Sequence, residues 1–182
     1  MRSGIATVTD FRSLARDPDS WLRMARGHRS VAEVLWCRYL DVRGADLDDP
    51  RHEESKGCFL GFMLHAGLAV ENAAKGALIA KKPRIVEGPK LNRRAWGRKG
   101  GHELGRLVDR VLDCLSEEET DLLARLEQSV RWTGKYPVPL EGDRLSWEGR
   151  QIDYPKDHQT LDELLERLYR AIPASGGGEG SA

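Results

Sequence analysis

The side chains of this sequence that could do chemistry gather around a basic stretch near the middle of the chain. The stretch 81–99 contains one acid, Glu87, and the basic residues Lys81, Lys82, Arg84, Lys90, Arg93, Arg94, Arg98 and Lys99. Guanidinium and ammonium groups at this density can pair with phosphate oxygens. We therefore predict a ligand-binding set that consists of Arg93, Arg94, Trp96, Arg98, Lys99, Gly101 and His102. Trp96 could stack on a base. The alternative is a solvated loop that pairs with the acidic segment 103–127, within one chain or across a dimer.

Two pairs of residues could support acid–base catalysis on a phosphodiester. His102 can exchange a proton near neutral pH, and Arg98 lies four residues before it. A base beside a cation is what cleavage of RNA without a metal requires. Arg23 and His28 offer the same combination, although such a short spacing arises readily by chance in an arginine-rich chain. The plainer interpretation of His102 is a structural histidine that packs the start of a helix.

Four polar residues interrupt the apolar segment 58–80, CFLGFMLHAGLAVENAAKGALIA. His65 and Asn72 are seven residues apart and would share one helix face, which makes them further candidate ligand-binding residues. Glu71 and Lys75 are four apart and could form an ion pair. The four could line a polar pocket inside a helical bundle. They could equally form a hydrogen-bonded network with one ion pair, because buried polar groups must be paired.

Composition and motifs argue against several other classes of site. The 29 basic and 29 acidic residues balance, so no global field draws the chain to nucleic acid. Metal-binding HExxH and CxxC patterns and nucleotide-binding Walker and GxGxxG motifs do not occur, so we predict no metal and no cofactor. The separated Cys37, Cys58 and Cys114 predict reduced, buried thiols in a cytoplasmic protein. Charges inside 58–80 argue against a membrane span, and the N-terminus lacks the apolar run of a signal peptide.

Helical periodicity dominates the elements that must position these residues. Helices are predicted over 21–42, 51–81, a stretch opened by Gly101 and His102 with a stripe from Leu104 to Leu115, 116–132 after a Ser116–Glu119 capping box, and a stripe from Leu161 to Ile172. Small residues in 61–77 predict close approach of another helix. A small hairpin at 144–153 is possible. We predict an all-α, four- to five-helix up-and-down bundle at 17–172, with an N-terminal extension at 1–16 and a flexible tail at 173–182.

The order of these motifs resembles the HEPN domain over roughly residues 20–140. The resemblance is carried by HAGLAVENAAKGALIA at 65–80, by Gly101-His102 at a helix opening, and by the basic-Tyr-Pro sequence Lys135-Tyr136-Pro137. It implies an up-and-down helical bundle, often a homodimer, that binds nucleotides or RNA. It also implies a setting in prokaryotic defence or toxin–antitoxin systems. The catalytic branch of the family carries arginine and histidine four to six residues apart on a late helix, whereas Arg23 and His28 lie on the first predicted helix.

The sequence therefore leads to three hypotheses about function. The first is a HEPN-like, non-catalytic module that binds a phosphate-bearing ligand, either nucleotide or RNA, or a protein partner. The second is a metal-independent endoribonuclease that uses His102 with Arg98, or His28 with Arg23. The third is a protein-interaction subunit that presents Trp132, Tyr136 and Trp147, which lie in or beside the proline-rich segment 135–158.

Overall fold

The computed structural model describes residues 8–82, 96–97, 102–133 and 156–173, and all the regular structure in these ranges is helical. The elements are α1 (Val8–Arg16), α2 (Pro18–Val42), α3 (Arg51–Lys81), α4 (Leu104–Asp109), α5 (Glu117–Gln128), a π-helical turn η3 (Ser129–Thr133) and α6 (Lys156–Arg170). The prediction of an all-α bundle is confirmed. The hairpin predicted at 144–153 and most of the proposed tail lie outside the described residues.

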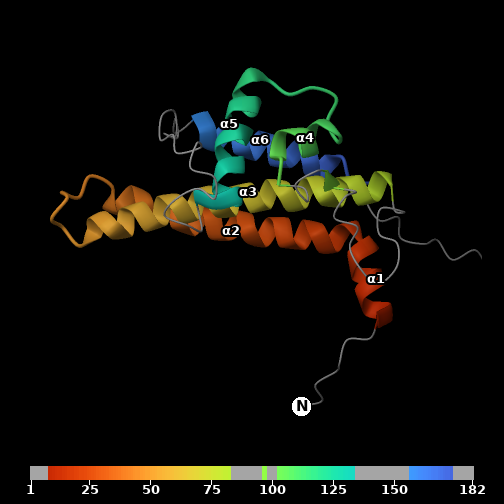
Figure 1. The fold of residues 1–182 in the computed structure, drawn as a ribbon, viewed down its shortest axis with the longest axis horizontal. Helices are drawn as coiled ribbons and strands as arrows, with labels where there is room; N and C mark the ends of the chain where they lie inside the picture. The colour runs from red at the N-terminus through yellow and green to blue at the C-terminus, as the bar shows by residue number, and fades with distance from the viewer. Residues whose placement is uncertain (1–7, 83–95, 98–101, 134–155, 174–182) are drawn as a thin grey trace, which may run out of the picture.

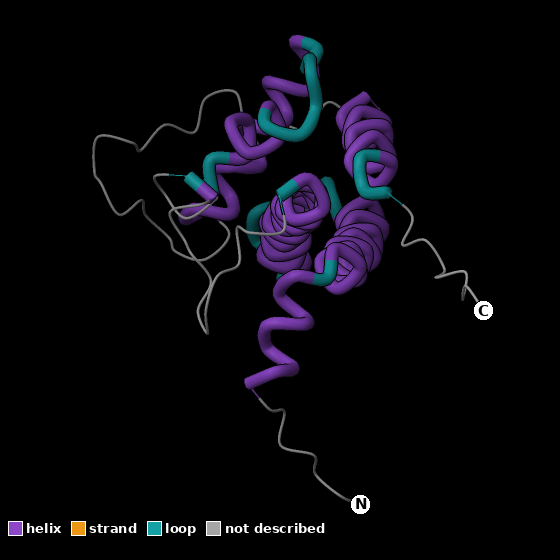
Figure 2. Tube along the Cα trace, turned by 90° about the vertical axis from the view of Figure 1, so that its right-hand side faces the viewer, coloured by secondary structure: helices purple, strands orange, loops and turns teal. Residues whose placement is uncertain are grey.

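A long hairpin of α2 and α3 forms the centre of the bundle. Asp17 caps α2, because its carboxylate accepts hydrogen bonds from the backbone N–H groups of Asp19 and Ser20. Pro18 occupies the first helical position, where a missing N–H costs nothing. The predicted bounds of α3 match the observed 51–81. Helices α4, α5 and α6 lie on one side of the hairpin, and α1 projects from the other (Figures 1 and 2).

Helix α3 is the axis of the core, since it contacts α2, α4, α5, η3 and α6. Its glycines lie where neighbours come closest. A Cβ added to Gly67 would lie 2.5 Å from Val130 of η3 and 3.1 Å from the backbone oxygen of Leu126. One added to Gly76 would lie 3.1 Å from the Cβ of Trp21. The prediction that small residues allow close helix approach is therefore confirmed, and it explains why α3 carries so many of them.

The third predicted helix is shorter than expected. Helix α4 ends at Asp109, and the chain turns there through backbone bonds from Val111 and Leu112 to the oxygen of Val108. The apolar stripe still packs into the core, because its first members are buried: Leu104, Leu107, Val108 and Val111. The reversal is enforced by the next helix. Ser116 caps α5 in an extended conformation with the predicted capping box, so the preceding residues must form a connection rather than another helical turn.

Helix α6 completes the bundle by burying Leu161, Leu164, Leu165 and Leu168. It begins at Lys156, a few residues before the predicted stripe. Helix α1 lies within the predicted N-terminal extension and was not anticipated. Its end is fixed to α2 by a hydrogen bond of 3.0 Å from Nε1 of Trp21 to the carbonyl oxygen of Ala15.

The cysteines are free thiols, but the prediction that all are buried was wrong. Cys58 is buried, whereas Cys37 and Cys114 are exposed. Cys37 lies on the outward face of α2, and Cys114 lies in the connection that replaces the last turns of the third predicted helix. In both places the apolar neighbours used to infer burial point in other directions. Among the described helices, none is long and apolar enough to traverse a lipid bilayer.

Candidate functional site

Within the described residues, the strongest candidate site is a cluster of ionisable side chains. Its centre is Glu71, a buried carboxylate on α3. Its Oε1 accepts a hydrogen bond of 2.5 Å from Nζ of Lys75, one turn further along the helix. Its Oε2 lies 2.8 Å from Nδ1 of His102, in the segment that leads into α4. Both Glu71 and Lys75 are buried. The predicted ion pair is confirmed, but it is a core ion pair that also holds the histidine.

The electrostatics of the site favour an ionised Glu71. Burial alone would raise the pKa of this carboxyl group, but the hydrogen bond from His102 and the charge of Lys75 outweigh burial and lower the pKa. An ionised carboxylate can only accept, so Nδ1 of His102 must carry the proton that it shares with Glu71. No described residue bonds to Nε2 of His102. The side chain is 36 % exposed, so Nε2 can serve as a proton acceptor when neutral and as a donor when charged.

Trp96 closes the site over Lys75. The Nζ atom of Lys75 lies 5.6 Å from the centroid of the Trp96 ring, at a distance typical of a cation–π contact. The ring also packs against Trp21, with centroids 5.6 Å apart. Because Trp96 is buried, stacking on a nucleic-acid base would require the side chain to leave this position. Its observed contacts seal the ion pair from solvent, so the structure does not offer Trp96 as an open stacking platform.

The basic stretch is only partly described. Lys81 donates a hydrogen bond of 2.6 Å to the carbonyl oxygen of Val111 and so ties the end of α3 to the turn after α4. Lys82 is exposed. The predicted ligand-binding residues Arg93, Arg94, Arg98, Lys99 and Gly101 lie outside the described residues. Helix α4 has six residues and begins two positions after His102, so a large positive end charge is not expected there.

The second predicted catalytic pair is not brought together. Arg23 donates hydrogen bonds to Asp17 and Ser20 at the start of α2. His28 instead faces α3, where its Nδ1 lies 3.0 Å from Nδ1 of His65. One ring must donate and the other accept, so the accepting ring is neutral and carries its proton on Nε2. Burial and the charge of His65 lower the pKa of His28, against a smaller raising effect of Glu71.

His65 and Asn72, predicted to share a helix face, have separate roles. His65 pairs with His28 between the two long helices. Asn72 donates a hydrogen bond of 2.8 Å from its side-chain amide to the carbonyl oxygen of Leu68, and it lines a hollow beside α1. The structure therefore brings Glu71, Lys75, Trp96 and His102 into one cluster and leaves His65 and Asn72 beside it.

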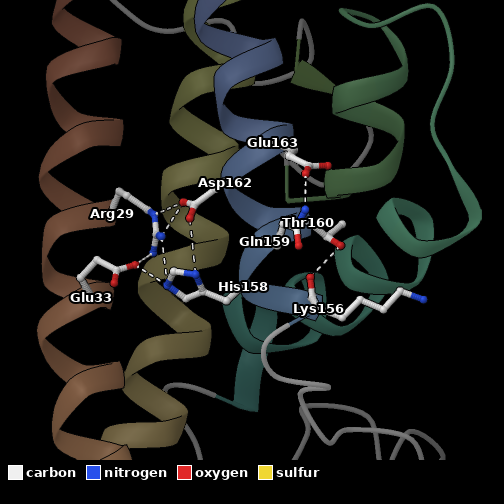
Figure 3. Close-up of polar contacts among 8 residues, drawn as sticks. All are labelled: Arg29, Glu33, Lys156, His158, Gln159, Thr160, Asp162 and Glu163. Carbon is white, nitrogen blue, oxygen red and sulfur yellow. Dashed lines mark hydrogen bonds and ion pairs between the residues drawn. The ribbon is translucent and has the colours of Figure 1, made fainter.

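Sequence reasoning missed a second polar cluster, which joins α2 to α6 (Figure 3). Arg29 donates from Nε and Nη2 to Oδ1 of Asp162, at 3.0 and 2.5 Å, and pairs with Glu33. His158 lies between these groups, with Nε2 2.7 Å from Oε1 of Glu33 and 3.2 Å from Nη2 of Arg29. Nε2 can donate to Glu33 or accept from Arg29 but cannot do both. The members are separated by up to 133 residues in sequence, so no local pattern signals the cluster.

A polar hollow of about 440 Å³ lies on the other side of α6, next to the start of α5. Its charged groups satisfy one another. Arg167 donates to Oε1 of Glu119 at 2.5 Å and to the carbonyl oxygen of Cys114 at 2.6 Å, and Lys156 lies 3.4 Å from Glu118. The pairs Arg167–Glu119 and Lys156–Glu118 therefore tie α6 to α5. A further hydrogen bond of 2.7 Å, from Gln159 to Glu163, lies within α6 (Figure 3).

The described residues contain no group of three or more histidine, cysteine, aspartate or glutamate side chains placed to hold a metal ion. Comparison of the chain with protein-family models, with curated proteins and with solved structures found no match. The resemblance to HEPN domains therefore stays a prediction, and the geometry of the Glu71 cluster has to carry the functional argument.

Proposed function

We propose that this helical bundle binds a phosphate-bearing ligand, a nucleotide or RNA, at the rim where α3 and the start of α4 meet. The observation that supports the proposal is the pairing of His102 with Glu71. The buried carboxylate of Glu71 fixes the Nδ1 edge of the imidazole, while about a third of the His102 side chain stays open to solvent. A charged His102 can donate from Nε2 to a phosphate oxygen, as charge-assisted hydrogen bonds of this kind are strong.

Charge balance at the rim supports the same function. Lys75 neutralises Glu71, so protonation of His102 leaves the cluster with one net positive charge. The chain that leads to His102 carries Arg93, Arg94, Arg98 and Lys99. In this proposal these four cations supply most of the affinity for phosphate, and His102 supplies a directed contact. The resemblance to HEPN domains suggests a homodimer and a role in defence or toxin–antitoxin systems, as a module without catalysis.

The experiment is a binding titration of the full chain with fluorescein-labelled single-stranded RNA and with labelled ATP, at several salt concentrations. Binding should weaken as salt rises, because phosphate contacts release counterions. Arg94→Glu with Arg98→Glu should weaken binding at least about tenfold, with unchanged helix content. A matched control is Arg43→Glu with Lys56→Glu, which makes the same change of charge at exposed positions on the far end of the α2–α3 hairpin. No salt-dependent affinity, or an equal loss in both double variants, would refute the proposal.

The contribution of His102 is tested separately. His102→Gln should weaken RNA binding, because glutamine cannot offer the charged Nε2–H donor that a protonated imidazole offers to a phosphate oxygen. His52→Gln is the control, since His52 lies at the start of α3, away from the rim. If His102→Gln binds RNA as tightly as His52→Gln and the unaltered protein do, His102 is a structural residue only.

A second candidate function, a metal-independent endoribonuclease, is favoured by the same 2.8 Å contact between Glu71 and His102. A carboxylate that orients an imidazole through Nδ1 leaves Nε2 as a general base. RNA cleavage in excess EDTA that is lost in His102→Ala would support this function, and His28→Ala tests the other predicted pair. Cleavage that survives in both variants would indicate a contaminating nuclease and exclude this function.

A further inference from the structure

Trp96 and His102 bring the two ends of one short connection to neighbouring turns of α3. Nζ of Lys75 lies 5.6 Å from the ring centroid of Trp96, and Oε2 of Glu71 lies 2.8 Å from Nδ1 of His102. Lys75 and Glu71 are four residues apart on α3, so the two contacts are separated by about 6 Å along the helix axis. Five residues separate Trp96 from His102 in the sequence. The chain therefore contacts α3 at Trp96 and returns to it at His102, one helical turn away.

Trp96 is the more firmly held of these two ends. The residue is 4 % exposed, whereas the His102 side chain is 36 % exposed. The ring of Trp96 also packs against Trp21 of α2, with centroids 5.6 Å apart, and Nε1 of Trp21 donates a hydrogen bond to the carbonyl oxygen of Ala15. A tryptophan side chain buries about 150–250 Å² of surface. Trp96 therefore anchors this part of the chain to both helices of the central hairpin.

The residue after the anchor has a backbone conformation that favours glycine. Gly97 has a φ of 115°, in the region that residues with a Cβ rarely adopt. A Cβ added to Gly97 would meet no atom within 4 Å, so the preference comes from the backbone and not from a lack of space. The buried ring of Trp96 fixes where the chain meets α3, and Gly97 sets the direction in which the chain continues.

The proposed function depends on four cations that all lie within three residues of this anchor in the sequence: Arg93, Arg94, Arg98 and Lys99. Three residues of chain span at most about 11 Å, so the anchor limits how far the backbone of each cation can lie from that of Trp96. Holding charged side chains near their ligand before it binds lowers the entropy cost of ordering them. We propose, on the basis of that function, that Trp96 is a positioning residue, which holds the cations at the rim for the phosphate groups of RNA.

The test compares the affinity of full-chain variants for fluorescein-labelled single-stranded RNA over a range of salt concentrations. Trp96→Ala should weaken binding at least about tenfold, because the cations lose their anchor. It should also flatten the dependence of affinity on salt, since fewer phosphate contacts form at once. Trp96→Phe should restore most of both, because phenylalanine keeps an aromatic contact with Lys75 and Trp21.

Phe62→Ala is the matched control for the loss of a buried ring. Phe62 is a core residue of α3 that packs against Trp36, about 2.5 helical turns before Glu71. Its truncation should lower the free energy of unfolding but leave the RNA affinity of the folded protein, and the salt dependence of that affinity, unchanged.

Gly97→Ala gives a second test that removes no side-chain contact. The strained backbone should displace the anchor, so this variant should also bind RNA more weakly, and it decides the outcome if Trp96→Ala does not fold. Unchanged RNA affinity in folded Trp96→Ala, or in Gly97→Ala, would overturn the inference, as would a loss no larger than that in Phe62→Ala. If Arg94→Glu with Arg98→Glu weakens binding while Trp96→Ala does not, the phosphate site stands and only the anchoring role of Trp96 is rejected. If the unaltered protein shows no salt-dependent affinity for RNA, the proposed function fails and this inference fails with it.

Discussion

The packing of η3 against α3 leads to a prediction in which one type of substitution has opposite effects along one helix. Alanine in place of glycine inside a helix gains up to about 1 kcal/mol from helix propensity. At Gly67 the new methyl group would lie 2.5 Å from Cγ2 of Val130 and 3.1 Å from the backbone oxygen of Leu126. The backbone oxygen cannot rotate away, so α3 and η3 must separate. Overpacking of this kind costs about 1–3 kcal/mol, so Gly67→Ala should destabilise the protein by about 1–2 kcal/mol.

Two other glycines of α3 are matched controls. At Gly57 an added Cβ meets no atom within 4 Å, so Gly57→Ala should stabilise the protein by about 0.5–1 kcal/mol. At Gly61 the Cβ would lie 2.9 Å from Cδ1 of Leu35, the end of a flexible side chain that can change rotamer. The cost of that rotamer change and the propensity gain should nearly cancel.

Urea and thermal unfolding followed by far-UV circular dichroism can measure the series. For a chain of this size, 1 kcal/mol corresponds to about 2–4 °C in Tm. Gly67→Ala should therefore melt several degrees below Gly57→Ala, with the unaltered protein between them and an unchanged urea m-value. If Gly67→Ala were as stable as Gly57→Ala, the close packing of α3 against η3 and the explanation for the small residues of α3 would both be incorrect.

Three further predictions concern titratable groups of α3 and of the α2 helix with its cap. The folded state lowers the pKa of His28 beside His65, whereas the unfolded chain binds a proton near pH 6.5. The contribution of His28 to the free energy of unfolding should thus be constant above pH 6.5. Below pH 6.5 the free energy of unfolding should fall by at most about 1.4 kcal/mol per pH unit for this group. His28→Leu should flatten this pH dependence in urea titrations. Glu71→Gln leaves Lys75 as an unpaired buried charge and should cost about 3–5 kcal/mol, while Glu71→Leu with Lys75→Met should recover most of that loss in the same assay. Asp17→Ala removes the N-cap of α2 and should cost about 1 kcal/mol at pH 7, but little at a pH where the carboxyl group is protonated; an equal cost at both pH values would argue against capping.

Local patterns predicted the helices well because the signals for them are local. The apolar run with its small residues, the Ser116 capping box and the leucine stripes of α5 and α6 each depend on residues a few positions apart. The same reasoning overextended the third helix, since the stripe from Leu104 to Leu115 has helical period, while its second half forms a turn in which Val111 is buried. Burial does not need a continuous helix, so the period alone misjudged the element's length.

The sequence predicted only one of the two polar contacts of Glu71 in the candidate site. The Glu71–Lys75 ion pair follows from a spacing of four residues, which places both side chains on one helix face. That His102 completes the pair from 31 residues away does not follow from any local pattern. No local pattern predicts the packing of Trp96 against Trp21 or the contact of Arg29 with His158 either. These contacts depend on how separate parts of the chain pack together.

The amino-acid order alone was enough to establish a helical protein with a buried, small-residue central helix and a polar group placed inside it, because helix formation and capping are set by neighbours within one or two turns. The packing of the chain established which histidine reaches Glu71, which aromatic ring closes over Lys75, and which apolar side chains of α1 and α2 stay exposed. These outcomes depend on contacts between residues distant in sequence. Such contacts form only when the whole core closes, since each helix must bury its apolar face against the others.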